Sequence, residues 1–539
     1  MRTVWRRGLL LGALFGSLLP GAVAARTEEL GRIDFPTSGS AEAQKRFLRG
    51  ALLLHSFEFD DAAVEFRQAR KIEPGFAMAG WGEAMTFNHP LWMEQDAESA
   101  RRALDRLAPS PEARLSKAPT EREKMYLSAV ETLYGKGDKA ENDRAYAEAM
   151  RRLHEKFPED ENAAAFYALA LLGATEGKRD FPTYMKAAAI AEEVFAKNPL
   201  HPGAVHYLIH SYDDPIHAPL GMRAARVYAK IAPAAGHALH MPSHIFFASG
   251  MWEEAAASNE AAWKASLDRA AHKSLGPDDN NYHALFWLEY AYLQMGRYGD
   301  ARKTLAAMEE DAKRSGSGRA RSHRAMMRAA YVAERRRFDA DVVRALSEDD
   351  ERSVALFAEG FAALAKGNRE PAEKALAAIG KEPPGGHHGA GSTYTMGRAS
   401  GAGADPVIKK ELEALLASSN GDQERALALA REAAAAEDVM TFEVGPPAVV
   451  KPARELLGEM LLKLGDAAEA RAEFERSLAH TPERALSLLG LARAAAKSGD
   501  RAVAEDAYRR LAAVWRRADA DLPELAEARS SATQLAAAP

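Results

Sequence analysis

A short sequence recurs in this chain at a fixed distance, and it limits the folds that the chain can adopt. Residues 465–470 read GDAAEA, and residues 499–504, which begin 34 positions later, read GDRAVA. Related turns occur at 250–255 and 296–301. In each turn, the glycine can end one helix in a left-handed conformation, and the final alanine allows a second helix to pack closely. The recurrence predicts a stack of units with two helices each.

The rest of the chain agrees with a helical stack. Alanine, leucine, glutamate and arginine are abundant and favour helix, whereas alternating apolar runs typical of strands are nearly absent. The repeats resemble tetratricopeptide repeats over most of residues 40–535, strongly at both ends and around 235–310, and weakly at 95–200. The resemblance implies an all-α solenoid of helical hairpins that winds into a right-handed superhelix, with a concave groove lined by the first helix of each pair.

A second resemblance concerns the middle of the chain. Segments 201–215, 237–244, 282–294 and 445–447 are similar to those of exported bacterial tetratricopeptide proteins that have no assigned activity. This likeness implies a fold and a location but no reaction. Tetratricopeptide arrays commonly bind a peptide or protein segment in the groove, so the resemblance also implies such a partner.

The first 24 residues have the features of a secretory signal peptide. Arg2, Arg6 and Arg7 precede an apolar run over residues 8–19, and small residues follow at 22–24. The run is short for a membrane-spanning helix, so an uncleaved anchor is the weaker alternative. We expect a bacterial protein that is periplasmic or secreted, with no stable membrane span after cleavage.

Composition excludes several classes of function. The 71 Lys and Arg against 77 Asp and Glu give a net charge of −6, which argues against nucleic acid as a partner. Cysteine is absent, so disulfides and thiolate metal sites are excluded. We divide the mature chain into a helical array with a His-rich groove over 25–380, a flexible Gly-rich loop over 381–405, and tetratricopeptide repeats over 406–539.

Histidines are concentrated in one part of the sequence. Nine of the sixteen lie between residues 201 and 283. Two pairs have a spacing of four residues, His206 with His210 and His240 with His244, and this spacing places both rings on one helix face, where they can share a metal ion. Pro242 complicates the second pair, because a helix that starts there leaves His237 and His240 on the preceding loop.

The repeat register relates these histidines to one another. Counted back from the turn glycines, His237 and His283 occupy equivalent positions of the repeat. The resemblance to tetratricopeptide repeats implies that they lie with the two pairs in the groove rather than in the core. We therefore predict a transition-metal site, for Zn, Cu, Ni or Fe, formed by His206, His210, His240, His244 and His283. Asp213 and Asp214 are candidate ligands or acceptors that fix a histidine tautomer, with His237 nearby. A buried polar network and a pH-sensitive groove are the alternatives.

Four more residues are weaker candidates for the groove. Glu455 and Glu459 have the offsets of His240 and His244 from their own turn glycine, so they are expected to bind a cation or a basic group, or to be an ordinary exposed pair. His89 and Trp92 lie in a segment that looks like a shaped loop and are candidates for an aromatic wall. Ordinary packing is the alternative for both.

Two classes of function remain open from the sequence. The first is an exported scaffold that binds a peptide or protein segment in its groove and carries a His-rich metal site. The alternative is a metal-handling protein or an uncharacterised metalloenzyme that uses the histidine cluster. The familiar hydrolase, zinc-protease and dinucleotide motifs are missing, so no catalytic residue and no substrate are predicted.

Overall fold

The computed structural model describes residues 29–336, 338–346, 353–381, 398–442 and 444–537. The predicted signal peptide, 1–24, lies outside the described residues. Helices make up most of the described chain, and the strands within it form one antiparallel pair in which Asn88 faces Gln95. The predicted all-α class is therefore confirmed.

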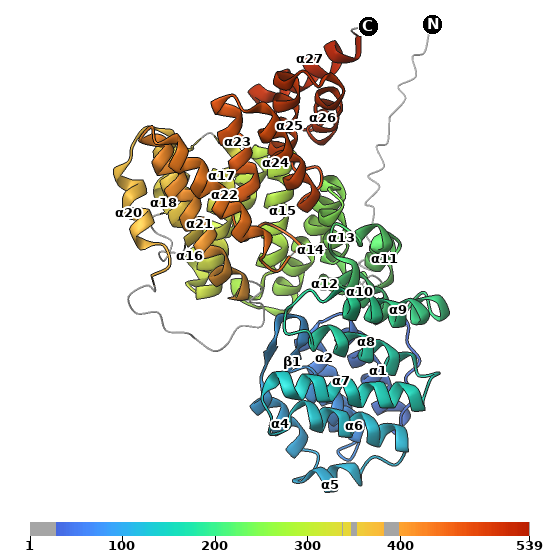
Figure 1. Cartoon of the computed structure of the whole chain (residues 1–539). Helices are drawn as coiled ribbons and strands as arrows, with labels where there is room; N and C mark the ends of the chain where they lie inside the picture. The colour runs from blue at the N-terminus through green and yellow to red at the C-terminus, as the bar shows by residue number, and fades with distance from the viewer. Residues whose placement is uncertain (1–28, 337, 347–352, 382–397, 443, 538–539) are drawn as a thin grey trace, which may run out of the picture.

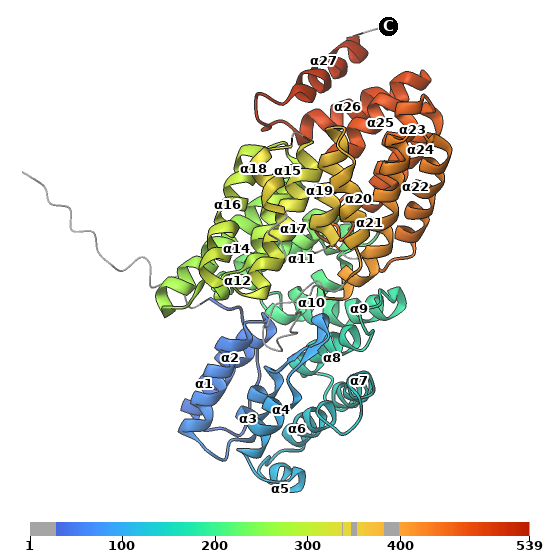
Figure 2. The same cartoon turned by 90° about the vertical axis from the view of Figure 1, so that its left-hand side faces the viewer.

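The N-terminal part forms the lower body of the molecule in Figures 1 and 2. Its helices pack mainly as consecutive antiparallel neighbours, as in a stack of hairpins. Its elements are α1 (Ala41–His55), α2 (Phe59–Ile72), α3 (Ala77–Met85), β1 (Asn88–His89), η2 (Pro90–Trp92), β2 (Glu94–Gln95), α4 (Ala97–Asp105), α5 (Pro111–Leu115), α6 (Glu121–Leu133), α7 (Lys139–Lys156) and α8 (Glu161–Gly173).

The middle of the chain joins the two ends of the molecule. In both views, α10 lies between the N-terminal helices and the upper body (Figures 1 and 2). The elements of this part are α9 (Phe181–Lys197), α10 (Pro202–Tyr212), α11 (Ala218–Ile231), α12 (Gly236–His240), α13 (Pro242–Ala248), α14 (Trp252–Lys273), η3 (Pro277–Asp279), α15 (Tyr282–Gln294), α16 (Tyr298–Ser315) and α17 (Gly318–Arg335).

The C-terminal part completes the upper body. Consecutive helices again pack as antiparallel neighbours, and α15 and α17 also contact one another directly. The elements are α18 (Ala340–Leu346), α19 (Ser353–Ala365), α20 (Glu370–Ala378), α21 (Arg398–Ser419), α22 (Gln423–Asp438), α23 (Ala453–Leu464), α24 (Ala467–His480), α25 (Ala485–Ser498), α26 (Arg501–Val514) and α27 (Pro523–Ala537).

The repeat predicted from sequence is visible in how one phenylalanine packs at each end of the chain. Phe474 on α24 fits against Gly490, where an added Cβ would come within 2.3 Å of its ring. Phe66 on α2 fits against Gly82 in the same way, at 2.4 Å. Both glycines lie 16 residues after their phenylalanine, so the two contacts are equivalent positions of one repeat. Only glycine permits this approach of helix to ring.

The turn glycines have the predicted left-handed conformation. Gly465 and Gly499 end α23 and α25 with φ of 97° and 81°, and Gly250 and Gly296 have φ of 67°. A left-handed residue at this position lets the chain reverse after a few residues, so the second helix of each unit lies antiparallel to the first. The helical hairpin is therefore the unit of the stack.

Two expectations about local structure need correction. The loop predicted for 381–405 is shorter, because α21 already begins at Arg398 and buries Ala404, while residues 382–397 lie outside the described residues. Alanines between the glycines of this segment supply the helix preference that the glycine count obscured. His237 and His240 lie on the short helix α12 rather than on a loop, and α13 begins at Pro242 as its first residue. Within the described residues, no helix combines the length and apolar character needed to cross a membrane.

Candidate metal centre

Six histidines from four helices meet in the middle of the molecule. Helix α10, between the lower and upper bodies, carries two of them, and the others follow on the next elements of the stack (Figures 1 and 2). Five of the six are at most 8% exposed, and the sixth, His283, is half-buried. The six are His206 and His210 on α10, His237 and His240 on α12, His244 on α13 and His283 on α15.

The burial of these side chains corrects one implication of the tetratricopeptide resemblance. We expected the histidines to line an open groove, yet His206 and His240 have no exposed surface. The ring of Phe57, from the turn between α1 and α2, covers His206 with ring centres 4.3 Å apart. On the other side, Trp287 of α15 stacks on His244 at 4.6 Å. Neighbouring helices therefore enclose the cluster.

The first group of three is His206, His210 and His237. One possible ligand atom from each lies within 4.8 Å of the other two. The Nε2 atoms of His206 and His237 are 3.1 Å apart. His206 Nδ1 lies 2.8 Å from the carbonyl oxygen of His55 and donates to it, so its Nε2 carries the lone pair. His210 Nε2 is buried and has no hydrogen-bond partner.

The second group of three is His240, His244 and His283, which meets the same 4.8 Å limit. The Nε2 atoms of His240 and His244 lie 3.2 Å apart across the break between α12 and α13. His240 Nδ1 is 2.6 Å from Oδ1 of Asn259 on α14. His283 Nε2 is buried without a hydrogen-bond partner. This group again directs lone-pair nitrogens toward a common point.

Asp213 connects the two groups. Its Oδ2 lies 3.0 Å from His244 Nδ1 and 3.6 Å from His210 Nδ1, so one carboxylate orients a histidine of each group. Arg179, on the segment before α9, forms an ion pair with Asp213 and another with Asp214 at 2.8 Å. Burial raises the pKa of Asp213, but Arg179 and the two histidines outweigh it, and the pKa lies well below its usual value.

Asp214 serves a different purpose from its neighbour. Its carboxylate accepts hydrogen bonds from the backbone N–H groups of Ile216 and His217, and it lies 2.9 Å from His217 Nδ1. It therefore shapes the turn into α11. The hydrogen bonds and ion pairs of its side chain go to Ile216, His217 and Arg179, none of which belongs to the two histidine groups.

Burial keeps the histidines in the form that binds metals. It lowers the pKa of His206, His237, His240 and His283 well below the usual value, and neighbouring histidines lower it further. For His210, burial outweighs the opposite effect of Asp213, and the pKa is again lowered. Neutral imidazoles are the ligands that Zn, Cu, Ni and Fe(II) accept, and no proton must be displaced before an ion binds.

Phe57 occupies a position that glycine holds in other repeats. It lies five residues before Ala62, as Gly465 lies five before Ala470, and its φ is 57°. A phenylalanine in a left-handed conformation costs about 1–2 kcal/mol relative to an ordinary one. In return, the ring contacts His206, His210 and His237, and it also lines an apolar pocket with Phe59 and Phe166. Backbone strain of this kind is concentrated at functional sites.

Of the two remaining candidates near the cluster, Trp92 contacts the first histidine group and His89 does not belong to either group. Trp92 lies against the first group, with its ring centre 6.0 Å from that of His237 and 5.4 Å from that of Phe57. His89 is one step further out, stacked on Phe59 at 4.1 Å. Both belong to the aromatic surroundings of the site and to its packing.

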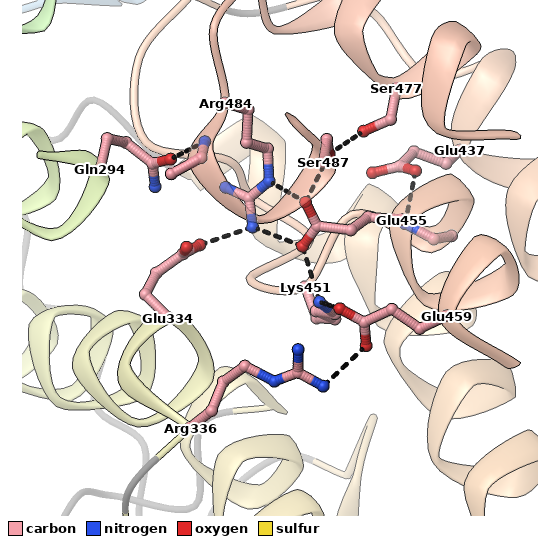
Figure 3. A network of polar contacts seen from close by, with 12 residues as sticks. Gln294, Glu334, Arg336, Glu437, Lys451, Glu455, Glu459, Ser477, Arg484 and Ser487 are labelled. Atoms are coloured by element: carbon pink, nitrogen blue, oxygen red, sulfur yellow. Dashed lines mark hydrogen bonds and ion pairs between the residues drawn. The ribbon is translucent and has the colours of Figure 1, made fainter. Parts of the chain in front are cut away.

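Glu455 and Glu459 lie in another part of the molecule and do not join the histidines. Glu455 has no exposed surface, so the expectation of an ordinary exposed pair is wrong for it. It receives hydrogen bonds from Lys451 at 2.6 Å and from Arg484 at 2.8 and 2.9 Å, while Glu459 binds Lys451 at 2.7 Å (Figure 3). The basic groups that these carboxylates bind are the chain's own.

The same network ties the centre of the molecule to its C-terminal repeats. Arg484 also donates to Glu334 on α17 at 2.6 Å (Figure 3). It donates in addition to the hydroxyl of Tyr290 on α15. These partners lie 150 and 194 residues away in the sequence. Arg484, Glu334 and Glu455 are buried and paired with one another, so we regard the network as a structural link between helical layers.

Three residues that matter to the histidines were not predicted from sequence. Arg179 holds Asp213, Asn259 fixes the orientation of His240, and Phe57 covers the first group. A phenylalanine at the glycine position of a repeat was a readable signal for Phe57. Arg179 and Asn259 carry no local pattern, because their role depends on which helices become neighbours.

Comparisons with known proteins give a general helical likeness. No known protein family and no curated protein matches the chain. Among solved structures, it is similar to the human IFIT1 dimer with m7Gppp-AAAA, with 13% identity over 94% of this chain and 92% of that one and a TM-score of 0.34. It is similar to the yeast Tom70 structure with 13% identity over 92% of this chain and 96% of that one, with a TM-score of 0.32. For the P58(IPK) TPR domain, the identity is 14% over 85% of this chain and 99% of that one, with a TM-score of 0.22. Scores this low assign no function to the chain.

Proposed function

We propose that the protein binds transition-metal ions inside its helical scaffold, at the six clustered histidines. The observation that carries the proposal is the pair of Nε2 atoms of His240 and His244, 3.2 Å apart. At that separation, either one ring donates a hydrogen bond to the other or a cation binds both nitrogens.

Neither ring has a hydrogen to donate at Nε2. His244 Nδ1 donates to the Asp213 carboxylate, which can only accept. His240 Nδ1 faces Asn259 Oδ1, because the amide nitrogen of Asn259 donates to the Ala255 carbonyl at 2.8 Å. A neutral imidazole has one N–H, so both Nε2 atoms carry lone pairs that repel each other. An ion bound between them replaces this repulsion with two ligand bonds.

A proton is a poor choice for that cation. Burial and the neighbouring His244 lower the pKa of His240 well below its usual value, so protonation near neutral pH is unfavourable. A metal ion would bind a third nitrogen, from His283, in addition to those of His240 and His244, whereas a proton is shared by two nitrogens at most. A carboxylate that orients a metal-binding histidine through its other nitrogen is a frequent arrangement, and Asp213 has that relation to His244.

The donor set narrows the class of metal. All six donors are imidazole nitrogens, and the chain has no cysteine, which suits Zn, Cu, Ni and Fe(II) and excludes thiolate sites. Three protein ligands leave coordination positions open, as in catalytic rather than structural zinc sites. We propose metal handling as the function, without assigning a reaction.

The peptide-binding alternative loses its support at these residues. Five of the six rings have almost no exposed surface and cannot form hydrogen bonds to a peptide on the outside of the stack. We therefore propose that the clustered histidines bind metal ions, and we propose no peptide-binding role for them. The resemblance of residues 1–24 to a secretory signal peptide supports the further proposal that the mature protein works in the periplasm or outside a bacterial cell.

The test is metal content. Residues 25–539, expressed without an affinity tag and refolded with Zn²⁺, should retain Zn²⁺ after treatment with a chelator, as measured by elemental mass spectrometry. The His206→Ala/His240→Ala variant should lose it. The matched control is His272→Ala/His480→Ala, which removes two exposed histidines and should change nothing. Parent protein that retains no Zn²⁺, Cu²⁺, Ni²⁺ or Fe²⁺ under the same treatment refutes the proposal.

A further inference from the structure

We infer that the histidine cluster is a two-ion centre, with one ion at each group of three. This inference rests on the proposed function and goes further, because it assigns the number of ions and the kind of ligand that they share. The first ion would be bound by His206, His210 and His237, and the second by His240, His244 and His283.

The spacing of the nitrogens separates the two groups. Two nitrogens on one zinc ion, each about 2.1 Å from it, lie at most about 4.2 Å apart. Among the described residues, the sets of candidate ligand atoms that lie within 4.8 Å of one another contain three members each, and the one set that spans both groups takes a single histidine from each, His210 and His244, with Asp213. One ion therefore cannot take all six nitrogens, whereas two ions can use every one.

The two groups are nevertheless adjacent. The ring centres of His210 and His244, one from each group, are 5.4 Å apart, and those of His237 and His240 are 6.1 Å apart. His237 and His240 also belong to the same short helix, α12. Two ions bound at this spacing would be close enough to share a small ligand between them.

A third set of candidate ligands, His210, Asp213 and His244, is the link between the groups. His244 already donates from Nδ1 to Asp213 and presents Nε2 to His240, so it has no further nitrogen for another ion. Asp213 thus acts on both ions through one histidine of each. It is a positioning residue rather than a ligand.

Charge identifies the class of shared ligand. A histidine binds a metal ion as a neutral imidazole, and Arg179 forms ion pairs with both Asp213 and Asp214, so these three side chains carry one net negative charge. Two divalent ions in this buried site would carry four positive charges, most of them uncompensated, which is costly in a medium of low dielectric constant. Small anions in the open coordination positions lower that charge. We therefore assign hydroxide, or an anion of similar size, as the ligand that bridges the ions.

The first test of the two-ion centre is stoichiometry with Zn²⁺ alone as the probe. Metal-free parent protein, refolded with excess Zn²⁺ and then treated with a chelator, should retain two ions per chain. One ion per chain in the parent would overturn the two-ion centre but leave metal binding intact. No retained ion would refute the proposed function itself, so the two failures are distinguishable.

Two variants locate the ions. His237→Ala removes one ligand of the first group, and His283→Ala removes one of the second. Within the part of the chain that the structure describes, neither ring forms a side-chain hydrogen bond outside the cluster. Each variant should retain one ion per chain. Loss of both ions from either variant would point to a single shared site and contradict the assignment. Because the parent stoichiometry decides the question alone, a variant that fails to fold does not remove the test.

Discussion

The role of Asp213 can be tested with a single-atom change. Asp213→Asn keeps the size of the side chain but replaces a charged acceptor, bound by His244 at 3.0 Å and by Arg179, with a neutral amide. Replacing an acceptor that orients a metal ligand costs about 10–100-fold in affinity, which is about 1.4–2.7 kcal/mol. Since Asp213 faces one histidine of each group, we expect both ions to bind more weakly by factors in this range.

The neighbouring residue supplies a matched control. Asp214→Asn disrupts the same arginine, which lies 2.8 Å from Asp214, but its histidine contact is with His217, outside the two groups. The affinity of this variant for metal should stay close to that of the parent. Competitive titration of each metal-free protein with Zn²⁺ against a chromophoric chelator gives the affinities, and thermal unfolding without metal checks that both variants fold. Equal weakening in the two variants, or none in Asp213→Asn, refutes the reasoning.

Three further predictions concern the surroundings and the scaffold. Phe57→Gly should relieve about 1 kcal/mol of backbone strain but lose about 3–5 kcal/mol of ring packing, and it should speed the removal of bound Zn²⁺ by a chelator, because the ring separates the apolar pocket from His206. Arg484→Met should lower the free energy of unfolding, measured in urea, by about 3–5 kcal/mol, because it leaves the buried carboxylates of Glu334 and Glu455 without their shared cation. Glu411, which is fully buried with both carboxylate oxygens unpaired, has a pKa raised by burial well above its usual value. Its folded state therefore keeps a proton that the unfolded state releases, and parent stability should fall relative to Glu411→Gln as pH rises above about 4.5, at up to about 1.4 kcal/mol per pH unit.

Each of these predictions has an outcome that would contradict it. An unchanged rate of Zn²⁺ removal from Phe57→Gly would mean that ions exchange by another path. For Arg484→Met, the control is Arg431→Met, which removes an exposed ion pair with Glu469 and should cost less than about 1 kcal/mol. A similar loss of unfolding free energy in Arg484→Met and Arg431→Met would contradict the stabilising role of the buried network. Parallel stability curves for the parent and Glu411→Gln between pH 5 and 8 would mean that the carboxyl is not held neutral.

The sequence predicted the parts of this structure that depend on local spacing. Gly465 and Gly499 fixed the repeat register, and the four-residue spacing of His206 and His210 brought their rings together as expected. Burial was not predictable in the same way, because the covering ring of Phe57 comes from a turn about 150 residues earlier in the chain. An offset within a repeat predicts the helix face but not what packs against it.

The contrast between Glu455 and His240 illustrates this limit. Both lie ten residues before their turn glycine, yet Glu455 meets Lys451 and Arg484, whereas His240 meets His244 and Asn259. Equivalent positions in a solenoid share a backbone geometry, while their side-chain neighbours are set by other repeats. The chemistry of such a position therefore has to be determined from the neighbouring helices.

Enclosure of the histidines has a kinetic consequence for a protein of this design. The ligands are contributed by segments from His206 to His283, so the site comes into existence only when several hairpins have stacked. Once they have, exchange of an ion at the buried first group requires local opening around His206, which is slow compared with diffusion of a metal ion to a surface site. The metal bound at the first group of the proposed centre would then depend on which metals are available where and when the chain folds, and less on the order of its equilibrium affinities.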